Sequence, residues 1–298
     1  MFKTLSFFLL ITLLLPWCVT AKTIHSERSL YRNITVDDDG DLRCLKFHTK
    51  QQKSQQSCMY KSDPQKLVFS YTKLVMSSLL INSSPKNILI IGLGGGTLSN
   101  TFHQLFPDTN ITNVELDDAV SKVAREYFSY FENQHIKTVT QDGRIFIKRA
   151  ALKKQQYDLI ILDAFNGDYI PEHLMTQEFL QEVKKILSDD GVLAANTFST
   201  SKLYEYESAT YQSVFGNFYN VRNGNVSNRI ILAQPHSIDK DKLKPQIIKN
   251  SQQLKLKLKK YGVNSEKLSR KIKIDNDWDQ KIRLLTDQYS PVNLLKAR

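Results

Sequence analysis

The chain has 298 residues, of which 41% are hydrophobic and 24% are charged, and its formal net charge at pH 7 is +11. This length and composition are typical of a folded, soluble protein with one large core that needs no disulfide framework or structural metal. Beyond residue 21, no apolar run approaches the roughly 18 residues of a transmembrane helix. The excess of positive charge is compatible with binding to an anionic partner.

Residues 1–21 are typical of a secretory signal peptide. Lys3 supplies a positive charge, Leu5–Trp17 is almost wholly apolar, and Val19–Ala21 offers small residues for cleavage. The apolar run is shorter than a membrane-spanning helix requires. We therefore expect an exported protein, periplasmic or secreted, whose mature chain begins near residue 22.

Two cysteines, Cys44 and Cys58, remain beyond this leader. An oxidising compartment allows them to form one intramolecular bridge, and two free thiols are the alternative. They lie in the segment 22–66, where Asn33–Val36 and Leu42–Phe47 flank a turn rich in Asp and Gly. Two β-prone runs around such a turn predict a β-hairpin, so we expect 22–66 to form a small N-terminal β-module.

Residues 67–235 alternate between strand and helix patterns. We expect a helical stretch over about 67–80. After it, apolar runs predict parallel strands, and the segments between them predict helices. The expected strands are Asn87–Ile91, Ile111–Leu116, Ile136–Gln141, Tyr157–Leu162 and Gly191–Asn196, with helices at Asp118–Phe131 and Thr176–Leu187 and late, antiparallel strands at Val214–Val221 and Arg229–Gln234. This order predicts an α/β fold with a Rossmann-like doubly wound sheet that binds a nucleotide.

The segment 236–298 is a basic C-terminal extension. Between Ser237 and Ile274 there are 12 Lys or Arg against 3 Asp or Glu. Alternating Leu and Lys over 254–259 predicts an exposed strand or an irregular appendage. Because Tyr261 is almost the sole aromatic residue among these charges, we expect no nucleic acid partner. We interpret the segment as a solvated face, with peripheral contact to an anionic surface as the alternative.

Motifs at the ends of the expected strands indicate a nucleoside site. Gly92, Gly94 and Gly96 follow the first strand and open a helix, which lets the backbone approach a ligand closely. Glu115 ends the second strand, 23 residues after Gly92. An acid at that position can accept hydrogen bonds from both hydroxyls of a ribose.

Acidic residues also follow the third and fourth strands. Asp142, beside Gly143, can accept a hydrogen bond from the exocyclic amine of an adenine, although Asp-Gly is also a common turn. Asp163 ends the fourth strand, where open α/β sheets bind their ligands, and Asp168 lies on the loop after it. Two carboxylates there suit a cationic substrate or a general base, and shaping a turn is the alternative role of Asp168.

Together these motifs resemble the spermidine synthase family, the polyamine aminopropyltransferases, over roughly 29–234. Phe69–Thr72 is similar to the family's gate segment, with Tyr71 at the position of its tyrosine. Asp163–Thr176 is similar to the gatekeeping loop, and Leu285–Val292 to a recurrent ending of spermidine synthase-like bacterial proteins. The resemblance implies the class I S-adenosylmethionine-dependent transferase fold and a homodimer.

The resemblance also implies roles for the motif residues. Asp163 and Tyr71 would be catalytic, with Asp163 as the base for an amine of putrescine. The freed amine would attack the methylene beside a sulfonium, and methylthioadenosine would leave. Tyr71 and Asp168 would bind the polyamine. The adenosine of S-adenosylmethionine or of its decarboxylated form would be bound by Gly92, Gly94, Gly96, Glu115, Asp142 and Gly143.

Four positions depart from the family pattern. Gly95 replaces an aspartate that contacts both substrates, Asn166 replaces a second acid, and Thr72 and Arg32 each replace a glutamine. Fewer carboxylates weaken the binding of a diamine, and Arg32 would repel a diamine or hold the carboxylate of full S-adenosylmethionine. Two alternatives therefore stay open. One is a methyltransferase with another acceptor, and the other is a non-catalytic exported protein that binds a nucleoside or polyamine.

A nicotinamide cofactor and a metal are disfavoured. The glycine loop lacks strict G-x-G-x-x-G spacing, and Asp142 has no role in a dehydrogenase. The six histidines are scattered without the spacing of paired metal ligands, so we expect no metal site.

Overall fold

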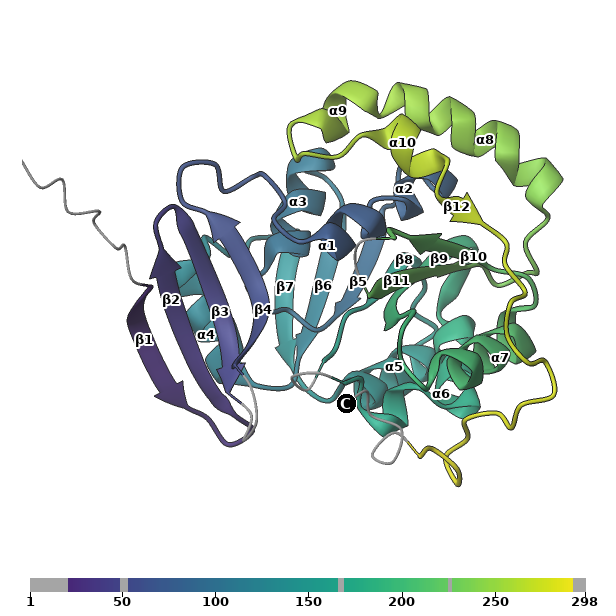
Figure 1. Ribbon diagram of the computed structural model, residues 1–298, viewed down its shortest axis with the longest axis horizontal. Helices are drawn as coiled ribbons and strands as arrows, with labels where there is room; N and C mark the ends of the chain where they lie inside the picture. Colours follow the sequence, from purple (N-terminus) through teal and green to yellow (C-terminus); the bar gives the residue numbers. More distant parts are fainter. Residues whose placement is uncertain (1–20, 49–52, 166–168, 225–226, 292–298) are drawn as a thin grey trace, which may run out of the picture.

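An eight-stranded sheet forms the centre of the computed structural model, which describes residues 21–48, 53–165, 169–224 and 227–291 (Figure 1). The strand order is β12-β10-β11-β9-β8-β5-β6-β7. These strands are β5 (Asn87–Ile91), β6 (Asn110–Glu115), β7 (Ile136–Thr140), β8 (Tyr157–Leu162), β9 (Leu187–Phe198), β10 (Tyr219–Arg222), β11 (Asn228–Ala233) and β12 (Ile272–Lys273).

The sheet is parallel from β9 to β7, and β11, β10 and β12 add antiparallel strands at the other edge. From β5 the chain runs to β6 and β7, then returns to β8 on the other side of β5. This reversal is the topological switch point at which such sheets bind ligands. The Rossmann-like doubly wound fold expected from the sequence is confirmed.

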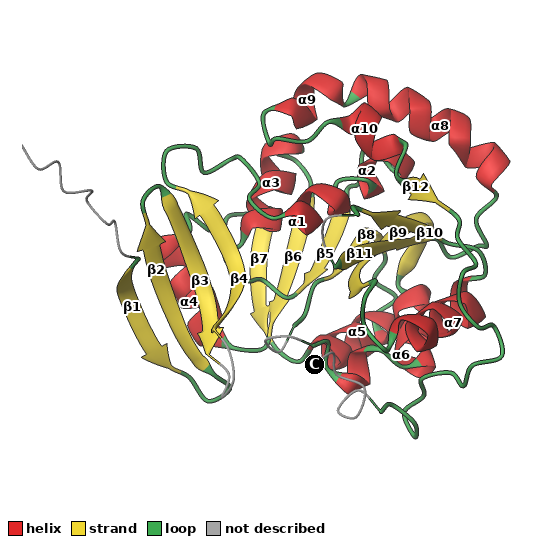
Figure 2. Cartoon of the chain, viewed as in Figure 1, coloured by secondary structure: helices red, strands yellow, loops and turns green. Residues whose placement is uncertain are grey.

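Helices cover both faces of the sheet, and Figure 2 shows the two layers. Apolar residues of the strands, such as Leu89 and Ile90, are buried against these helices. Capping side chains fix several helix starts: Asp117 accepts from the backbone N–H of Ala119, and Thr176 caps α6 in the same way. The helices between β5 and β10 are α3 (Thr97–Leu105), α4 (Asp118–Tyr127), α5 (Gly143–Leu152), η1 (Glu172–Leu174), α6 (Gln177–Lys185) and α7 (Tyr204–Phe215).

The N-terminal module is larger than the expected hairpin. The hairpin of β2 (Asn33–Asp39) and β3 (Leu42–His48) is present, and β1 (Lys22–Arg28) and β4 (Lys53–Tyr60) extend it to a four-stranded antiparallel sheet. One face packs against α4, where Ile34 and Leu45 of the sheet meet Val120 and Val123 of the helix. Cys44 and Cys58, opposite one another on β3 and β4, form a disulfide.

The helical stretch expected over 67–80 is present, but it is divided into two short helices. These are α1 (Ser70–Val75) and α2 (Ser78–Ile81). The hydroxyls of Ser77 and Ser78 donate to the carbonyl oxygens of Leu74 and Val75, at 2.5 and 2.8 Å. Hydroxyls that bind the preceding turn in this way compete with helix hydrogen bonds and bend the chain.

The strand expected over Val214–Val221 was also wrong in its first half. Val214 and Phe215 belong to the buried face of α7, and the helix ends at Gly216, whose φ of +70° suits glycine. The strand β10 begins after this turn, at Tyr219.

The basic extension is neither a strand nor an irregular appendage over 254–259. It forms α8 (Lys240–Gln253), α9 (Lys255–Lys259) and α10 (Ser265–Ser269), which lie above the sheet next to α2 (Figure 1). Leu254 and Leu258, four residues apart, are buried on one helical face, whereas Leu256 is 80% exposed. The Leu-Lys alternation concealed this helical spacing. Among the described helices, none is long and apolar enough to cross a membrane.

Candidate active site

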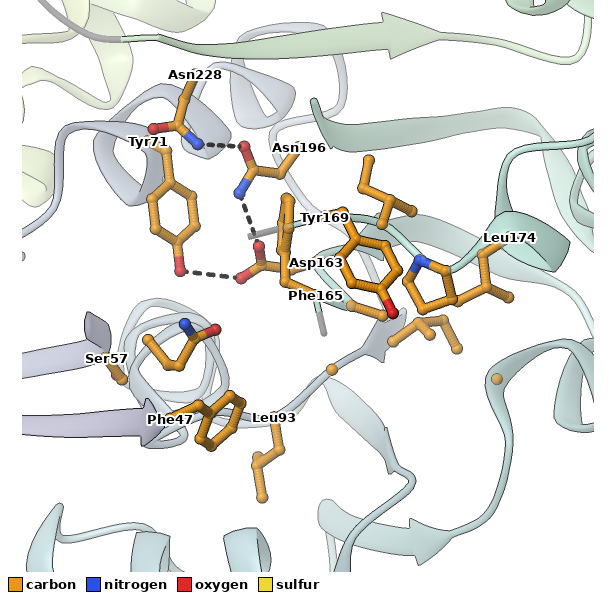
Figure 3. Close-up of a pocket in the computed structure, with 18 of the residues that line it drawn as sticks. Phe47, Ser57, Tyr71, Leu93, Asp163, Phe165, Tyr169, Leu174, Asn196 and Asn228 are labelled. Carbon is orange, nitrogen blue, oxygen red and sulfur yellow. Dashed lines mark hydrogen bonds between the residues drawn. The ribbon is translucent and has the colours of Figure 1, made fainter. Parts of the chain in front are cut away.

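A cavity of about 740 Å³ lies at the carboxyl ends of the central strands, beside the switch point. The glycine loop after β5, the end of β6 and the loop after β8 form one wall. The helix α1 contributes Tyr71, and the N-terminal sheet contributes Phe47 and Ser57 (Figure 3). The cavity therefore draws on elements that the sequence places far apart.

The glycine loop turns tightly at the edge of this cavity. Gly92, Gly94 and Gly96 have φ angles of +97°, +54° and +74°, which side chains rarely adopt. A Cβ at Gly92 would lie 2.4 Å from the carbonyl oxygen of Asp163. Gly92 and Gly94 line the cavity, whereas Gly96 precedes α3 and packs against the ring of Tyr130.

Glu115 ends β6 on the cavity wall and is only 7% exposed. Its carboxylate accepts hydrogen bonds from the backbone N–H groups of Leu93, at 3.0 Å, and Asp117, at 3.1 Å. Burial raises the pKa of Glu115, while these amides and the nearby Arg32 act to lower it. The carboxylate is thus fixed in orientation next to the glycine loop.

Asp142 is held by its own helix and by the loop opposite. Its Oδ1 accepts the backbone N–H of Ile145 at 3.0 Å, which caps α5. Its Oδ2 lies 2.8 Å from Nε2 of His173, a residue of η1. Asp142, Gly143 and His173 all line the cavity. Asp142 is therefore both a helix cap and a cavity residue.

Asp163 lies at the end of β8 and shares a hydrogen-bond network with three side chains (Figure 3). Tyr71 donates its hydroxyl to Oδ2 at 3.1 Å, and Asn196 donates Nδ2 to Oδ1 at 2.8 Å. Asn228 in turn donates Nδ2 to Oδ1 of Asn196 at 3.0 Å. Burial raises the pKa of Asp163 to about 7, although the bonds from Asn196 and Tyr71 lower it.

Tyr71 remains a hydrogen-bond donor in this network. Burial, followed by the negative charge of Asp163, raises the pKa of Tyr71 well above its usual value. The phenol is therefore un-ionised at neutral pH. Tyr71 keeps its own proton, and the carboxylate of Asp163 can accept a second proton from a ligand.

The structure shows the surroundings of Gly95 and Thr72, two of the positions that depart from the family pattern. A Cβ at Gly95 would lie 2.8 Å from Oγ of Ser57 and 3.1 Å from the ring of Phe128, so these side chains fill the space of the missing aspartate. Thr72 turns its hydroxyl back to the carbonyl of Phe69. Asp168 and Asn166 lie outside the described residues.

Arg32 lines the cavity from the loop that joins β1 to β2 of the N-terminal sheet. Its guanidinium lies 4.4 Å from the ring centroid of Phe47, and Nη1 donates to the carbonyl of Phe165 at 3.5 Å. Nε lies 3.7 Å from Oδ2 of Asp117. One fixed positive charge therefore faces the same cavity as the acids.

The sequence-based prediction missed Asn196, Asn228 and Glu207, which also line the cavity. Asn196 and Asn228 carry a weak signal, because each is a polar residue at the end of a buried strand. Glu207 lies within a helix, and nothing in its surrounding sequence indicates that it faces the cavity. Among the described residues, no group of three or more His, Cys, Asp or Glu side chains could hold a metal ion.

Comparisons with known proteins show the family to which this chain is similar. Residues 68–225 match the spermine/spermidine synthase domain. The chain is 46% identical over 296 residues to a polyamine aminopropyltransferase of Vibrio vulnificus, covering 98% of both chains. This chain belongs to the spermine/spermidine synthase family. The family expected from the motifs is thereby confirmed.

Solved structures support the fold of this family member. A probable spermidine synthase from Corynebacterium glutamicum superposes with a TM-score of 0.63 at 20% identity, covering 87% of this chain and 98% of its own. A spermidine synthase in complex with the transition state analogue AdoDATO gives 0.63 at 21% identity, covering 85% and 86%. The match to the Vibrio vulnificus relative spans almost the whole chain, including the N-terminal sheet and the basic helices.

Proposed function

We propose that the protein transfers an aminopropyl group from decarboxylated S-adenosylmethionine to an amine of a small polyamine such as putrescine. The observation that carries the proposal is Asp163, whose pKa lies near 7 and whose carboxylate is held between Tyr71 and Asn196 on the cavity wall. A base with a pKa near the working pH combines a useful ionised fraction with affinity for a proton.

The donor side of the cavity fits an adenosine. Glu115 presents a fixed carboxylate to the ribose hydroxyls, and Gly94 leaves the backbone open to a ligand. Asp142 and His173 can exchange their mutual hydrogen bond for contacts with an adenine. When bound, the donor supplies a sulfonium that makes its aminopropyl carbon reactive. Residues of this chain carry out the binding, orientation and proton transfer.

Asp163 has two tasks in this proposal. Its negative charge binds the ammonium form of the acceptor, and its carboxylate then accepts the proton whose loss frees the lone pair. Tyr71 and Asn196 occupy one lone pair on each oxygen, which orients the remaining lone pairs toward the cavity. Burial excludes water, so the carboxylate is poorly solvated and more basic than an exposed aspartate.

The test is a transfer assay on the full chain with decarboxylated S-adenosylmethionine and putrescine. We expect equimolar methylthioadenosine and spermidine, and a rate that rises with pH through about 7 as Asp163 ionises. Asp163→Asn should lower kcat by about 10²–10⁴-fold. Absence of both products, with donor binding intact by calorimetry, would contradict aminopropyl transfer and leave only the nucleoside site.

One observation favours a second candidate, transfer from full S-adenosylmethionine. Arg32 places a guanidinium on the cavity wall, where it can bind a carboxylate that the decarboxylated donor lacks. Calorimetry with both donors separates the candidates. Tighter binding of full S-adenosylmethionine, lost in Arg32→Gln, would favour methyl transfer. Tighter binding of the decarboxylated donor, unchanged in Arg32→Gln, would favour aminopropyl transfer.

We further propose that the protein is exported. The leader-like segment 1–21 and the disulfide between Cys44 and Cys58 both suit an oxidising compartment outside the cytosol. Fractionation of expressing cells, with N-terminal sequencing of the recovered protein, tests this proposal. An N-terminus near residue 22 in the periplasm or medium is expected, and an intact Met1 in the cytosol would refute it.

Two partner contacts complete the proposal. Lys255, Lys257 and Lys259 are exposed on α9 around the exposed Leu256, which suits peripheral contact with an anionic membrane surface. Sedimentation with phosphatidylglycerol vesicles, and not with phosphatidylcholine vesicles, is the expected result, and changing the three lysines to glutamine should abolish it. A homodimer is proposed from the family resemblance, and light scattering after gel filtration measures its mass.

A further inference from the structure

Asn228 is linked to Asp163 through a single intermediate, the carboxamide of Asn196. Nδ2 of Asn228 donates to Oδ1 of Asn196 at 3.0 Å, and Nδ2 of Asn196 donates to Oδ1 of Asp163 at 2.8 Å (Figure 3). Asn196 is 3% exposed. The two asparagines come from adjacent antiparallel strands, in which Asn196 is opposite Ile230. The backbone ladder therefore fixes their spacing.

The direction of these two hydrogen bonds determines which end of the Asn196 carboxamide faces Asp163. A carboxamide has a donor end and an acceptor end of almost the same shape, so Asn196 fits its site in two orientations. In the observed orientation its NH₂ group faces Asp163. If it were turned by half a rotation, its oxygen would face the carboxylate and repel it. The carboxylate of Asp163 favours the first orientation, and the NH₂ group of Asn228 stabilises it by donating to the oxygen of Asn196.

From this geometry we infer that Asn228 is a positioning residue for the transfer reaction, because it holds the donor end of Asn196 toward Asp163 and so keeps the base in its proton-accepting form. The inference rests on the proposed function of Asp163. Asn228 also lines the cavity at the first position of β11. Its replacement therefore perturbs the end of a strand and leaves the packed interior of the sheet in place.

Two other ionisable groups near Asp163, Tyr71 and Glu207, are considered when the titration of Asp163 is interpreted. Tyr71 of α1 donates a hydrogen bond to Asp163 and stays protonated because burial raises the pKa of Tyr71. Glu207 of α7 lines the same cavity, and burial raises its pKa to about 7 although Arg229 of β11 acts to lower it. Because Glu207 titrates in the same range as Asp163, its titration is removed in a Glu207→Gln background.

The test is a direct titration of Asp163 in the full chain by ¹³C NMR with carboxyl-labelled aspartate. The resonance is assigned by its loss in Asp163→Asn. Asn228→Leu, of nearly equal size, should raise the pKa of Asp163 by about one pH unit, since part of a charge-assisted hydrogen bond is lost. The same rise is expected in the Glu207→Gln background. The rate profile of transfer should move upward in pH by the same amount.

A double-mutant cycle separates positioning from a merely structural role. Asn196→Leu should raise the pKa of Asp163 at least as far as Asn228→Leu, and the pair together no further, because Asn228 acts only through Asn196. No rise in Asn228→Leu, or an undiminished rise when Asn196 is already leucine, would overturn the inference.

A second variant covers a loss of folding in Asn228→Leu. Asn228→Asp accepts from Asn196 instead of donating to it, so the turned amide and the added negative charge should together raise the pKa of Asp163 further than the leucine does. An unchanged titration in this variant would also overturn the inference. The readout needs no turnover, so failure of aminopropyl transfer would refute the proposed function while the positioning of Asp163 is still measured.

Discussion

At the scale of single residues, Asp163 combines a functional advantage with a loss of stability. Burial raises its pKa from 3.8 to about 7, so the folded protein binds a proton that the unfolded chain releases. The folded state is therefore progressively destabilised as pH rises from about 4 to about 7. Below that window the carboxyl is neutral in both states, and its burial no longer opposes folding.

This argument predicts that Asp163→Asn is more heat-stable than the wild type at pH 8. We expect a rise in Tm of about 2–4 °C, from roughly 1 kcal/mol of relieved desolvation. The gain is smaller than the full pKa shift implies, because asparagine accepts fewer hydrogen bonds from Tyr71 and Asn196. Differential scanning calorimetry at pH 8 and pH 5 tests it. A gain that fails to shrink at pH 5 would argue against ionisation as the cause.

The absent aspartate of the glycine loop gives a second prediction. Gly95→Asp should destabilise the protein by about 1–3 kcal/mol, because the new side chain meets Ser57 and the ring of Phe128. It should not strengthen putrescine binding in calorimetry. The matched control adds Ser57→Gly, which removes the nearer obstacle and should recover part of the stability in urea unfolding. Wild-type stability in Gly95→Asp alone would show that the space is open.

At the scale of elements, the central strands of the sheet can be predicted from the sequence, whereas the elements around them cannot. The runs ending at Ile91 and Leu162 are apolar and short, so their placement as buried strands needs only local information. In contrast, Val214 and Phe215 have strand-like composition but lie in α7, because their packing in the buried core with residues of other elements outweighs local propensity. Leu254 and Leu258 were misplaced for a different reason, because the Leu-Lys alternation concealed their helical spacing.

The candidate site divides in a similar way. Glu115, Asp142 and Asp163 sit at strand ends, where topology brings carboxyl ends to one edge, so the sequence places them correctly on the cavity wall. The partners that orient Asp163 depend on strand order. Asn196 and Asn228 become neighbours only because β11 pairs antiparallel with β9. Pairing between distant strands cannot be read from a local pattern.

One element-scale prediction concerns Arg229, which is fully buried in β11 and ties that strand to α7. Its guanidinium donates to Thr197 at 2.9 Å, to Ser208 at 2.6 Å and to Glu207 at 3.3 Å. At pH 8, Arg229→Met should cost about 3–5 kcal/mol, because it leaves Glu207 buried without the guanidinium that lowers its pKa. Urea unfolding measures it.

The surface variant Arg222→Met is the control for that prediction, since its ion pairs with Asp275 and Asp277 are partly exposed. It should change stability by less than about 1 kcal/mol. Adding Glu207→Gln to Arg229→Met should restore much of the loss, because the unpaired charge is then gone. If the two arginine variants were equally destabilised, burial of the Arg229 pair would not explain the result.

At the scale of the whole molecule, the cavity depends on how the N-terminal sheet is held against the large one. The small sheet and its β1–β2 loop contribute Arg32, Phe47 and Ser57 to the cavity wall, while the acids come from the Rossmann-like sheet. Packing of β2 and β3 on α4 holds the two together. Ligand affinity should therefore report on the integrity of the N-terminal sheet even though the proposed catalytic residues lie elsewhere.

The disulfide between Cys44 and Cys58 gives the prediction at this scale. It closes a segment with a sequence separation of 14, for which loop-closure entropy suggests about 3 kcal/mol of stabilisation. The double variant Cys44→Ser, Cys58→Ser should unfold at lower urea and bind methylthioadenosine more weakly, because the wall formed by β3 and β4 loosens. Dithiothreitol should reproduce both effects in the wild type and change nothing in the double variant. Lower stability with unchanged ligand affinity would mean that the bridge supports the small sheet alone, and that the large sheet forms the binding site without its help.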